Sequence, residues 1–146
     1  MTPRARTAPR RWILAALCLT VGTTAIAGGI TLVARPDGSL LQLPVSVLRH
    51  SPFSGFLIPG LILLVIVGFT NLVAGVMVAR DAPAGNAAAF CGGLALLGWI
   101  VTQLLLLRTV EGLQVCYLLA ALAILAEANH RRSRQPPRSQ FDASPG

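Results

Sequence analysis

Four long stretches of apolar residues divide the chain, with short polar segments between them. They cover residues 12–34, 55–79, 87–107 and 112–128, and Glu127 is the one charged residue that they contain. An α-helix needs about 20 residues to cross the hydrocarbon core of a bilayer. The lengths of the stretches therefore predict four membrane crossings.

The crossings are predicted to be helices. Inside lipid, backbone polar groups are satisfied only in helices or closed barrels, and barrel strands alternate apolar and polar residues. Unbroken apolar runs such as residues 61–67, LILLVIV, lack that alternation. The pattern predicts an all-α fold: an integral membrane bundle of four transmembrane helices, in one domain over residues 12–128.

The composition excludes a soluble alternative. Of the 146 residues, 54% are hydrophobic and 12% are charged, whereas soluble domains carry about 25% charged residues. A soluble domain of this size would have to bury four apolar helices completely, and too little chain remains to cover them.

The segment between the first two stretches, residues 35–54, is expected to be a partly apolar outer loop. Residues 36–38, PDG, are typical of a tight turn. Pro44 suits the first turn of a short helix, which we expect from Pro44 to Arg49. A loop this rich in leucine and valine should lie in the membrane interface or fold over the end of the bundle. It would act there as a plug, or as a lid or docking surface.

The positive charges are arranged asymmetrically, and all twelve come from arginine. Nine of them fall on one side of a four-span protein: Arg4, Arg6, Arg10, Arg11, Arg80, Arg131, Arg132, Arg134 and Arg138. The positive-inside rule makes that side cytoplasmic. We therefore expect a multi-pass protein of a bacterial plasma membrane with both termini in the cytoplasm. Its basic tails, residues 1–11 and 129–146, should be disordered and should contact anionic lipids rather than nucleic acid.

The first stretch has a second interpretation. A basic start, an apolar centre and Ala25-Ile26-Ala27 also describe a cleavable signal peptide, whose removal would leave three helices. The apolar stretch, however, is longer than the 7–15 residues typical of a signal core. We favour a retained first helix and keep cleavage of residues 1–27 as the alternative.

Small residues recur at every fourth position in the stretches, a spacing that lets membrane helices pack closely. We expect four such faces to meet in the bundle: Ala16, Thr20, Thr24 and Gly28; Asn71, Gly75 and Ala79; Ala89 and Gly93; Gly112, Cys116, Ala120 and Ala128.

Few polar side chains lie within the stretches, and those that do are the candidate functional residues. Thr20 and Asn71 have similar predicted depths, so we expect a hydrogen bond between them. Gln103 and Gln114 flank the tight turn RTVE and are expected to bridge that hairpin. Together with Trp99, these residues are interhelical or ligand contacts. Arg108 and Glu111 have the spacing of a solvated helical pair.

The remaining chemistry is sparse. No ionisable residue lies deep in a stretch, so a coupled transporter lacks a proton or cation carrier. Three single cysteines without C-x-x-C and two separated histidines indicate neither a redox centre nor a metal site. We therefore predict a protein that is not an enzyme, with no catalytic, cofactor-binding or metal-binding residues.

Three segments carry a resemblance: residues 36–72, PDGSLLQLPVSVLRHSPFSGFLIPGLILLVIVGFTNL, then GWIVTQ and EGLQVCYLL. Across residues 36–119 the chain resembles a set of small, uncharacterised four-helix integral membrane proteins of bacteria, especially actinobacteria. The resemblance implies the topology and adds no activity.

Two functions fit a four-helix membrane bundle without catalytic residues. The first is a non-enzymatic scaffold or accessory subunit that packs against a membrane-protein partner or forms a homo-oligomer. The alternative is a small carrier or binder of an apolar small molecule or lipid, with Asn71, Trp99, Gln103 and Gln114 as contacts. A cavity lined by polar groups would favour the binder, and tight packing would favour the scaffold.

Overall fold

The computed structural model describes residues 8–41, 54–107 and 111–133. All regular structure in these ranges is helical. The elements are α1 (Ala8–Ala34), the 3₁₀-helix η2 (Ser39–Leu41), α2 (Leu57–Leu61), the π-helix η4 (Ile62–Phe69), α3 (Thr70–Ala79), α4 (Gly85–Leu107) and α5 (Gly112–Arg132). Because α2, η4 and α3 follow one another without a break, the described chain forms four long helices. The prediction of an all-helical fold with four long apolar helices is confirmed.

Each of the four long helices is long and apolar enough to cross a membrane. Between 22% and 39% of the most apolar window of each helix is buried inside the molecule. The other residues of these windows are exposed or half-buried, so the four helices leave much apolar surface uncovered.

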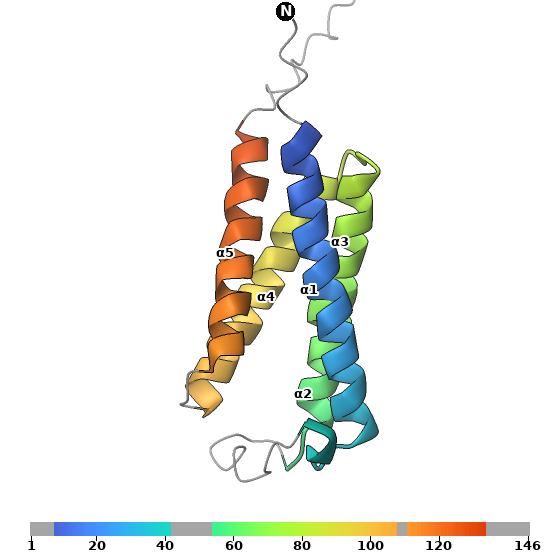
Figure 1. The fold of residues 1–146 in the computed structure, drawn as a ribbon, viewed down its shortest axis with the longest axis vertical. Coiled ribbons are helices and arrows are strands. Elements are labelled where there is room, and N and C mark those ends of the chain that lie inside the picture. Colours follow the sequence, from blue (N-terminus) through green and yellow to red (C-terminus); the bar gives the residue numbers. More distant parts are fainter. Residues whose placement is uncertain (1–7, 42–53, 108–110, 134–146) are drawn as a thin grey trace, which may run out of the picture.

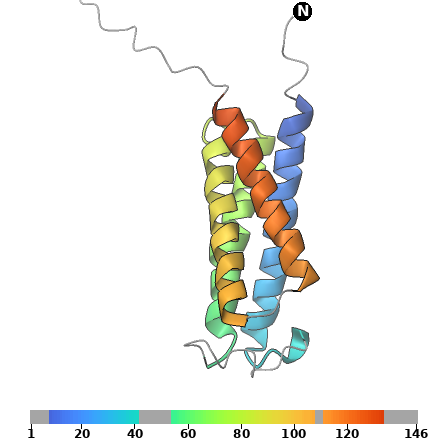
Figure 2. The ribbon, with the colours of Figure 1, turned by 90° about the vertical axis from the view of Figure 1, so that its left-hand side faces the viewer.

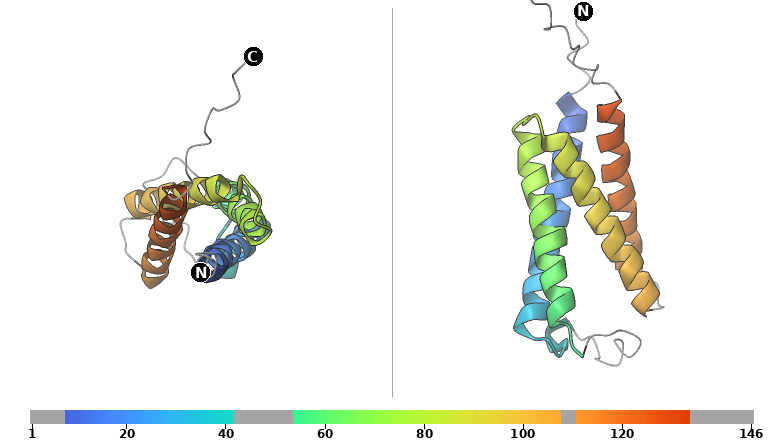
Figure 3. Two further views of the ribbon diagram at one scale, coloured as in Figure 1. Left: turned by 90° about the horizontal axis from the view of Figure 1, so that it is seen from above. Right: turned by 180° about the vertical axis from the view of Figure 1, so that it is seen from behind.

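The helices form an arc rather than a closed square. α1 packs along the helix over residues 57–79, α3 packs on α4, and α4 packs on α5. Seen from above, α1 and α5 are the two ends of this arc (Figure 3). The start of α1, the end of α5 and the turn between α3 and α4 lie at one end of the bundle, called the terminal end here (Figure 1). The opposite end, where α1 ends and α5 begins, is the loop end (Figure 2).

Side chains from all four helices make up the core, and most of them are small or branched aliphatic residues. The buried cluster contains Leu14, Ala15, Cys18, Val21, Ala25, Val67, Ala74, Val78, Ala89, Leu96, Ile100, Ala121, Ile124 and Ala128.

The closest helix contact is made by glycines of α1 and of the helix over residues 57–79, called the glycine interface here. A Cβ atom on Gly22 would lie 2.6 Å from the backbone nitrogen of Leu72, and one on Gly29 would lie 2.8 Å from that of Leu64. Across the contact, a Cβ on Gly68 would lie 3.0 Å from the nitrogen of Ile26. Only glycine lets the two backbones approach so closely, and such contacts favour helix association in lipid.

The π-helix keeps the glycine interface in register. Gly68 and Gly75 are seven residues apart, close to two α-helical turns, whereas Gly60 and Gly68 are eight apart. At about 100° per residue, eight residues of α-helix would turn Gly60 about 80° away from the face of Gly68. A π-helix bonds i to i+5 and so accommodates one additional residue. Because η4 begins after Gly60 and includes Gly68, both glycines face α1.

Polar contacts join the helices at the terminal end. Arg10 of α1 pairs with Glu127 of α5 at 3.4 Å, and Arg11 pairs with Asp81 of the α3–α4 turn at 3.4 Å. Exposed ion pairs of this kind contribute about 0.2–1 kcal/mol each. The Asn86 amide donates to the carbonyl of Ala128 at 2.8 Å, which fixes the start of α4 against the end of α5.

A tight turn follows α1 at the loop end. Gly38 has a positive φ of 75°, and its N–H donates to the carbonyl of Arg35 at 3.0 Å. The backbone N–H and the hydroxyl of Ser39 both donate to Asp37 Oδ1, at 3.1 and 2.8 Å. These hydrogen bonds to the ionised form lower the pKa of Asp37. The short helix expected from Pro44 to Arg49 lies outside the described residues.

Two of the four expected small faces are wrong. Ala16, Thr20 and Thr24 are exposed, and α1 packs instead through Cys18, Gly22, Ala25 and Gly29. On α5, Gly112 and Cys116 are exposed, and the packed residues are Gln114, Ala121, Ile124 and Ala128. The four-residue spacing is present on several faces of each helix, so it does not determine which face is covered. On the other two helices, Asn71, Gly75, Ala89 and Gly93 are buried.

Both outer helices extend further toward the termini than expected. α1 begins at Ala8 and α5 ends at Arg132. Residues 8–11 and 129–132 are therefore helical, although the apolar pattern assigns them to the disordered tails. Pro9 lies in the first turn of α1, where the missing N–H has no intrahelical partner to lose.

Deleting one residue should be tolerated in η4 but not in α3. Removing Val65 leaves Gly60 and Gly68 seven residues apart, so a regular α-helix keeps both on the face toward α1. Removing Val73 turns Gly75 by about 100° relative to Gly68. Both valines are exposed, so the two deletions remove the same side chain and shorten the helix equally.

The thermal unfolding of the two deletion variants is followed by circular dichroism in mild detergent. We expect the protein without Val65 to unfold near the wild-type temperature and the protein without Val73 to unfold well below it. Equal destabilisation by both deletions would show that the π-helix does not set the register.

Candidate functional site

A cavity of about 300 Å³ lies between α1 and η4 on one side and α4 and α5 on the other, toward the loop end. Figure 1 shows α4 and α5 diverging from α1 in this half of the bundle. The residues that line the cavity come from α1, η4, α4 and the start of α5. They are Thr24, Ala25, Gly28, Leu32, Leu63, Leu96, Trp99, Ile100, Gln103, Glu111, Leu113, Gln114 and Tyr117.

Helical spacing places these residues on common faces. On α1, Thr24, Gly28 and Leu32 are four residues apart, and on α4 the same spacing joins Trp99 to Gln103. Glu111, Gln114 and Tyr117 follow at intervals of three in the first turns of α5. Side chains three and four residues apart in a helix are neighbours, so each helix presents one continuous wall to the cavity.

Two adjacent glycines of α1 have different surroundings, which explains where the cavity begins. Gly29 packs against the backbone of Leu64 in the glycine interface. Gly28 faces the cavity, and among the described residues a Cβ there would meet only Leu63 Cδ2, at 3.4 Å. The missing side chain of Gly28 therefore leaves open space, whereas that of Gly29 permits a helix contact.

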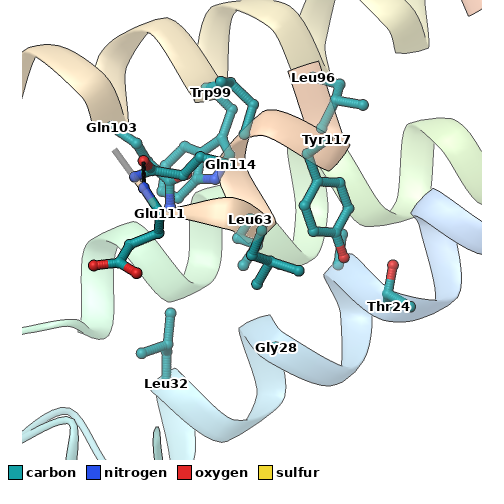
Figure 4. Close-up of a pocket in the computed structure, with 13 residues that line it drawn as sticks. Thr24, Gly28, Leu32, Leu63, Leu96, Trp99, Gln103, Glu111, Gln114 and Tyr117 are labelled. Atoms are coloured by element: carbon teal, nitrogen blue, oxygen red, sulfur yellow. Dashed lines mark hydrogen bonds between the residues drawn. The ribbon is translucent and has the colours of Figure 1, made fainter. Parts of the chain in front are cut away.

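The polar groups of the cavity come from three helices. Figure 4 shows the Tyr117 hydroxyl on α5 pointing toward α1, on the side of Thr24. The Thr24 hydroxyl donates to the carbonyl of Thr20 at 2.7 Å, so its oxygen can accept from a ligand. Trp99 and Gln103 add an indole N–H and an amide from α4. The remaining walls are aliphatic, so the cavity combines an apolar interior with a few hydrogen-bonding groups.

Glu111 carries the one formal charge among the described residues that line the cavity. It is the N-cap residue of α5, and its backbone N–H donates to Gln114 Oε1 at 3.0 Å. Figure 4 shows its carboxylate extending from the start of α5 toward the α1 wall at Leu32. Among the described lining residues, the formal negative charge thus lies on the side near the loop end.

Three of the five predicted contact residues line the cavity: Trp99, Gln103 and Gln114. The predicted bridge between the two glutamines is wrong. Gln114 is buried with its amide oxygen on the Glu111 N–H, and it bonds its own helix rather than Gln103. A capping position has a backbone donor to satisfy, and this local bond takes precedence over a contact across the hairpin.

Asn71 and Thr20 do not line the cavity, and the predicted hydrogen bond between them is wrong. Asn71 is completely buried between α3 and α4, where its amide donates to the carbonyls of Val67 at 2.9 Å and Gly92 at 3.1 Å. Thr20 lies on an exposed face of α1. The two residues match in depth, but depth does not fix the rotation of a helix about its axis.

Gly92 makes the position of Asn71 possible. A Cβ on residue 92 would lie 2.9 Å from Asn71 Oδ1, so a larger residue would push the amide away. Among the described residues, Oδ1 itself is buried without a hydrogen-bond partner. The Asn71–Gly92 contact therefore joins α3 to α4 and is structural.

Glu111 and Tyr117 are cavity residues that sequence reasoning missed. The spacing of Glu111 from Arg108 suggested a solvated pair, and Arg108 lies outside the described residues. The sequence did contain a signal for Glu111 and Tyr117: each lies three residues from Gln114, a spacing that makes them its neighbours on α5. Among the described residues, no group of three His, Cys, Asp or Glu side chains is arranged to hold a metal ion.

Substituting Asn71 should destabilise the bundle, whereas substituting Thr20 should not. Asn71→Ala removes both hydrogen bonds of the amide, and the interhelical bond to Gly92 is of a kind that contributes about 0.6 kcal/mol and up to about 1.7 kcal/mol. Thr20→Ala is the control, because that side chain is exposed. The measurement is the free energy of unfolding of each variant in mixed detergent micelles. An equal loss for the two variants would restore the Thr20–Asn71 bond as an explanation.

Comparisons with known proteins give no relative from which a function could be transferred. No protein-family model, no curated protein and no solved structure matches the chain.

Proposed function

We propose that this chain is a non-enzymatic, multi-pass protein of a bacterial plasma membrane that binds a small apolar molecule or a lipid chain in the cavity. The cavity is the observation that carries the proposal. Its volume of about 300 Å³ lies at the lower end of the range for ligand pockets, which are mostly apolar with a few placed polar groups. A bundle that served only as a scaffold would have no need of such a space.

The membrane location is supported by the outward-facing apolar surface and by the arginines. Arg10, Arg11, Arg80 and Arg132 all belong to the terminal end, so the positive-inside rule makes that end cytoplasmic. The cavity would then be in the outer half of the membrane. The turn over residues 35–38 and the start of α5 would lie at the outer surface.

Retention of the first helix is part of the proposal. Leu14, Cys18 and Gly22 of α1 belong to the packed interior. Cleavage after Ala27 would remove them together with half of the glycine interface. Thr24 and Ala25 would also leave the cavity wall, so both the fold and the site need the uncleaved chain.

The described cavity lining supports binding rather than catalysis. It contains no histidine, cysteine or serine, and the Thr24 hydroxyl donates to the carbonyl of Thr20 rather than to a carboxylate. Nucleophilic catalysis needs such a pair within hydrogen-bond reach.

A scaffold role is a second candidate, and the exposed face of α1 favours it. Ala16, Thr20, Thr23 and Ala27 lie on this face, and Thr23 donates its hydroxyl to the carbonyl of Leu19 at 2.8 Å. The side chains on this face are therefore small, and the Thr23 hydroxyl already has a hydrogen-bond partner. Both features suit close packing against another membrane helix. The partner would be a second copy or a larger membrane protein.

Filling the cavity should abolish ligand binding without unfolding the protein. In a Trp12→Phe background Trp99 is the single tryptophan, so its fluorescence reports on the cavity. We expect saturable quenching by 1-bromooctane in lipid nanodiscs, and we expect Gly28→Leu to remove the saturable component. Gly98→Leu is the matched control, because a Cβ at that position has no neighbour within 4 Å in the part of the chain that the structure describes.

Loss of the saturable component in both glycine variants, or in neither, would contradict binding in this cavity. Elution volume and helical circular dichroism show whether each variant is folded.

Enlarging a residue on the exposed face of α1 tests the scaffold. Thr20→Phe should prevent association with a partner helix, whereas Val101→Phe on exposed α4 surface should not. Chemical crosslinking in native membranes, followed by mass determination, measures the association. Identical crosslinked species for both variants and the wild type would exclude this face of α1 as the contact.

A further inference from the structure

We infer that the cavity prefers an organic cation with an apolar body, held by Glu111, Trp99 and Tyr117. The inference rests on the proposed function and specifies the chemistry of its ligand. Three observations carry it: the charge of the described lining, the aromatic rings on two walls, and the aliphatic interior.

The carboxylate of Glu111 differs from the two that pair at the terminal end. Glu127 and Asp81 each have an arginine nitrogen at 3.4 Å. Glu111 has no ion-pair partner among the described residues, and its side chain extends toward the α1 wall of the cavity (Figure 4). A positive group on the ligand would be attracted by this carboxylate, and an anionic group would be repelled.

The aromatic residues add to this preference. Trp99 lies on α4 and Tyr117 on α5, so two neighbouring walls each contribute a ring. The face of an aromatic ring is negative, and tryptophan attracts ammonium groups most strongly of the three aromatic residues. Rings and carboxylates together recognise quaternary ammonium ions without needing directional hydrogen bonds.

The rest of the cavity would receive the apolar body of the ligand. Leu63, Leu96 and Ile100 contribute aliphatic side chains to its lining. An inorganic cation could not bury this surface, and it would lose its hydration shell without enough oxygen ligands to replace it. The cavity therefore favours a hydrophobic ammonium ion over a metal ion.

A matched pair of ligands separates charge from shape. Benzyltrimethylammonium and neopentylbenzene have the same skeleton, with a quaternary nitrogen in one and a carbon in the other. Each compound is tested for its ability to displace 1-bromooctane and so to restore the Trp99 fluorescence, in nanodiscs of zwitterionic lipid. Empty nanodiscs give the reference for partitioning into the lipid. We expect the cation to compete at a lower concentration than the neutral compound.

Glu111→Gln keeps the size of the side chain and removes its charge. We expect it to weaken competition by the cation about tenfold, in keeping with one charge pair partly shielded by water, and to leave neopentylbenzene unchanged. Tyr117→Leu should also weaken competition by the cation more than competition by the neutral compound. Glu127→Gln removes a carboxylate at the opposite end of the bundle and should change neither.

The outcomes separate the two proposals. Saturable binding of 1-bromooctane with equal competition by both compounds, or a cation preference that survives Glu111→Gln, would overturn the cation inference and leave the cavity function intact. No saturable binding of any of the three compounds would overturn both. A cation preference lost in Glu111→Gln and in Gly28→Leu would establish the inference.

Discussion

The contact between glycines of α1 and of the helix over residues 57–79 is the constraint on which the rest of the structure depends. Between apolar helices in lipid there is no hydrophobic force, so close backbone packing has to supply the association. Gly22 and Gly29 meet Leu72 and Leu64 at distances that no other residue would allow. These positions lie on one face only because η4 accommodates an additional residue. The π-helix also presents Leu63 to the cavity, so the same irregularity determines both the packing and one wall of the site.

The two ends of the bundle are built differently. At the terminal end, ion pairs from Arg10 and Arg11 join α1 to α5 and to the α3–α4 turn, and the Arg132 guanidinium lies 5.1 Å from the centre of the Phe90 ring. At the loop end, α4 and α5 diverge from α1, and the space between them is the cavity. Because α1 and α5 are the two ends of the arc, contacts at the terminal end hold them together while the other end stays open. One end thus fixes the arrangement of the helices, and the other contains the cavity.

The chemistry of the cavity follows from the position of one N-cap. Gln114 bonds the Glu111 backbone and so places the first turn of α5 with Glu111 at its start and Tyr117 beyond it. An acidic residue is favoured at a helix N-terminus, and this one lies beside an aliphatic interior and two aromatic rings. A carboxylate deep in the membrane would be expensive, whereas one at the end of a helix keeps contact with water. Under the proposed function, this placement would let a charged ligand group enter without full dehydration.

The sequence by itself determined the number of helices, their approximate bounds and the poverty of the interior in ionisable groups, because these depend only on the length and composition of each apolar stretch. It also identified Trp99, Gln103 and Gln114, since polar and aromatic residues are rare in such stretches. It could not determine helix rotation: Thr20 and Asn71 match in depth but not in direction, and the exposed Ala16 follows the same small-residue spacing as the packed Gly22. Nor could it identify Glu111 as a cavity residue. Only the tertiary structure decided these points, because a face is buried or lines a cavity according to which neighbour packs against it, and that neighbour is distant in the chain.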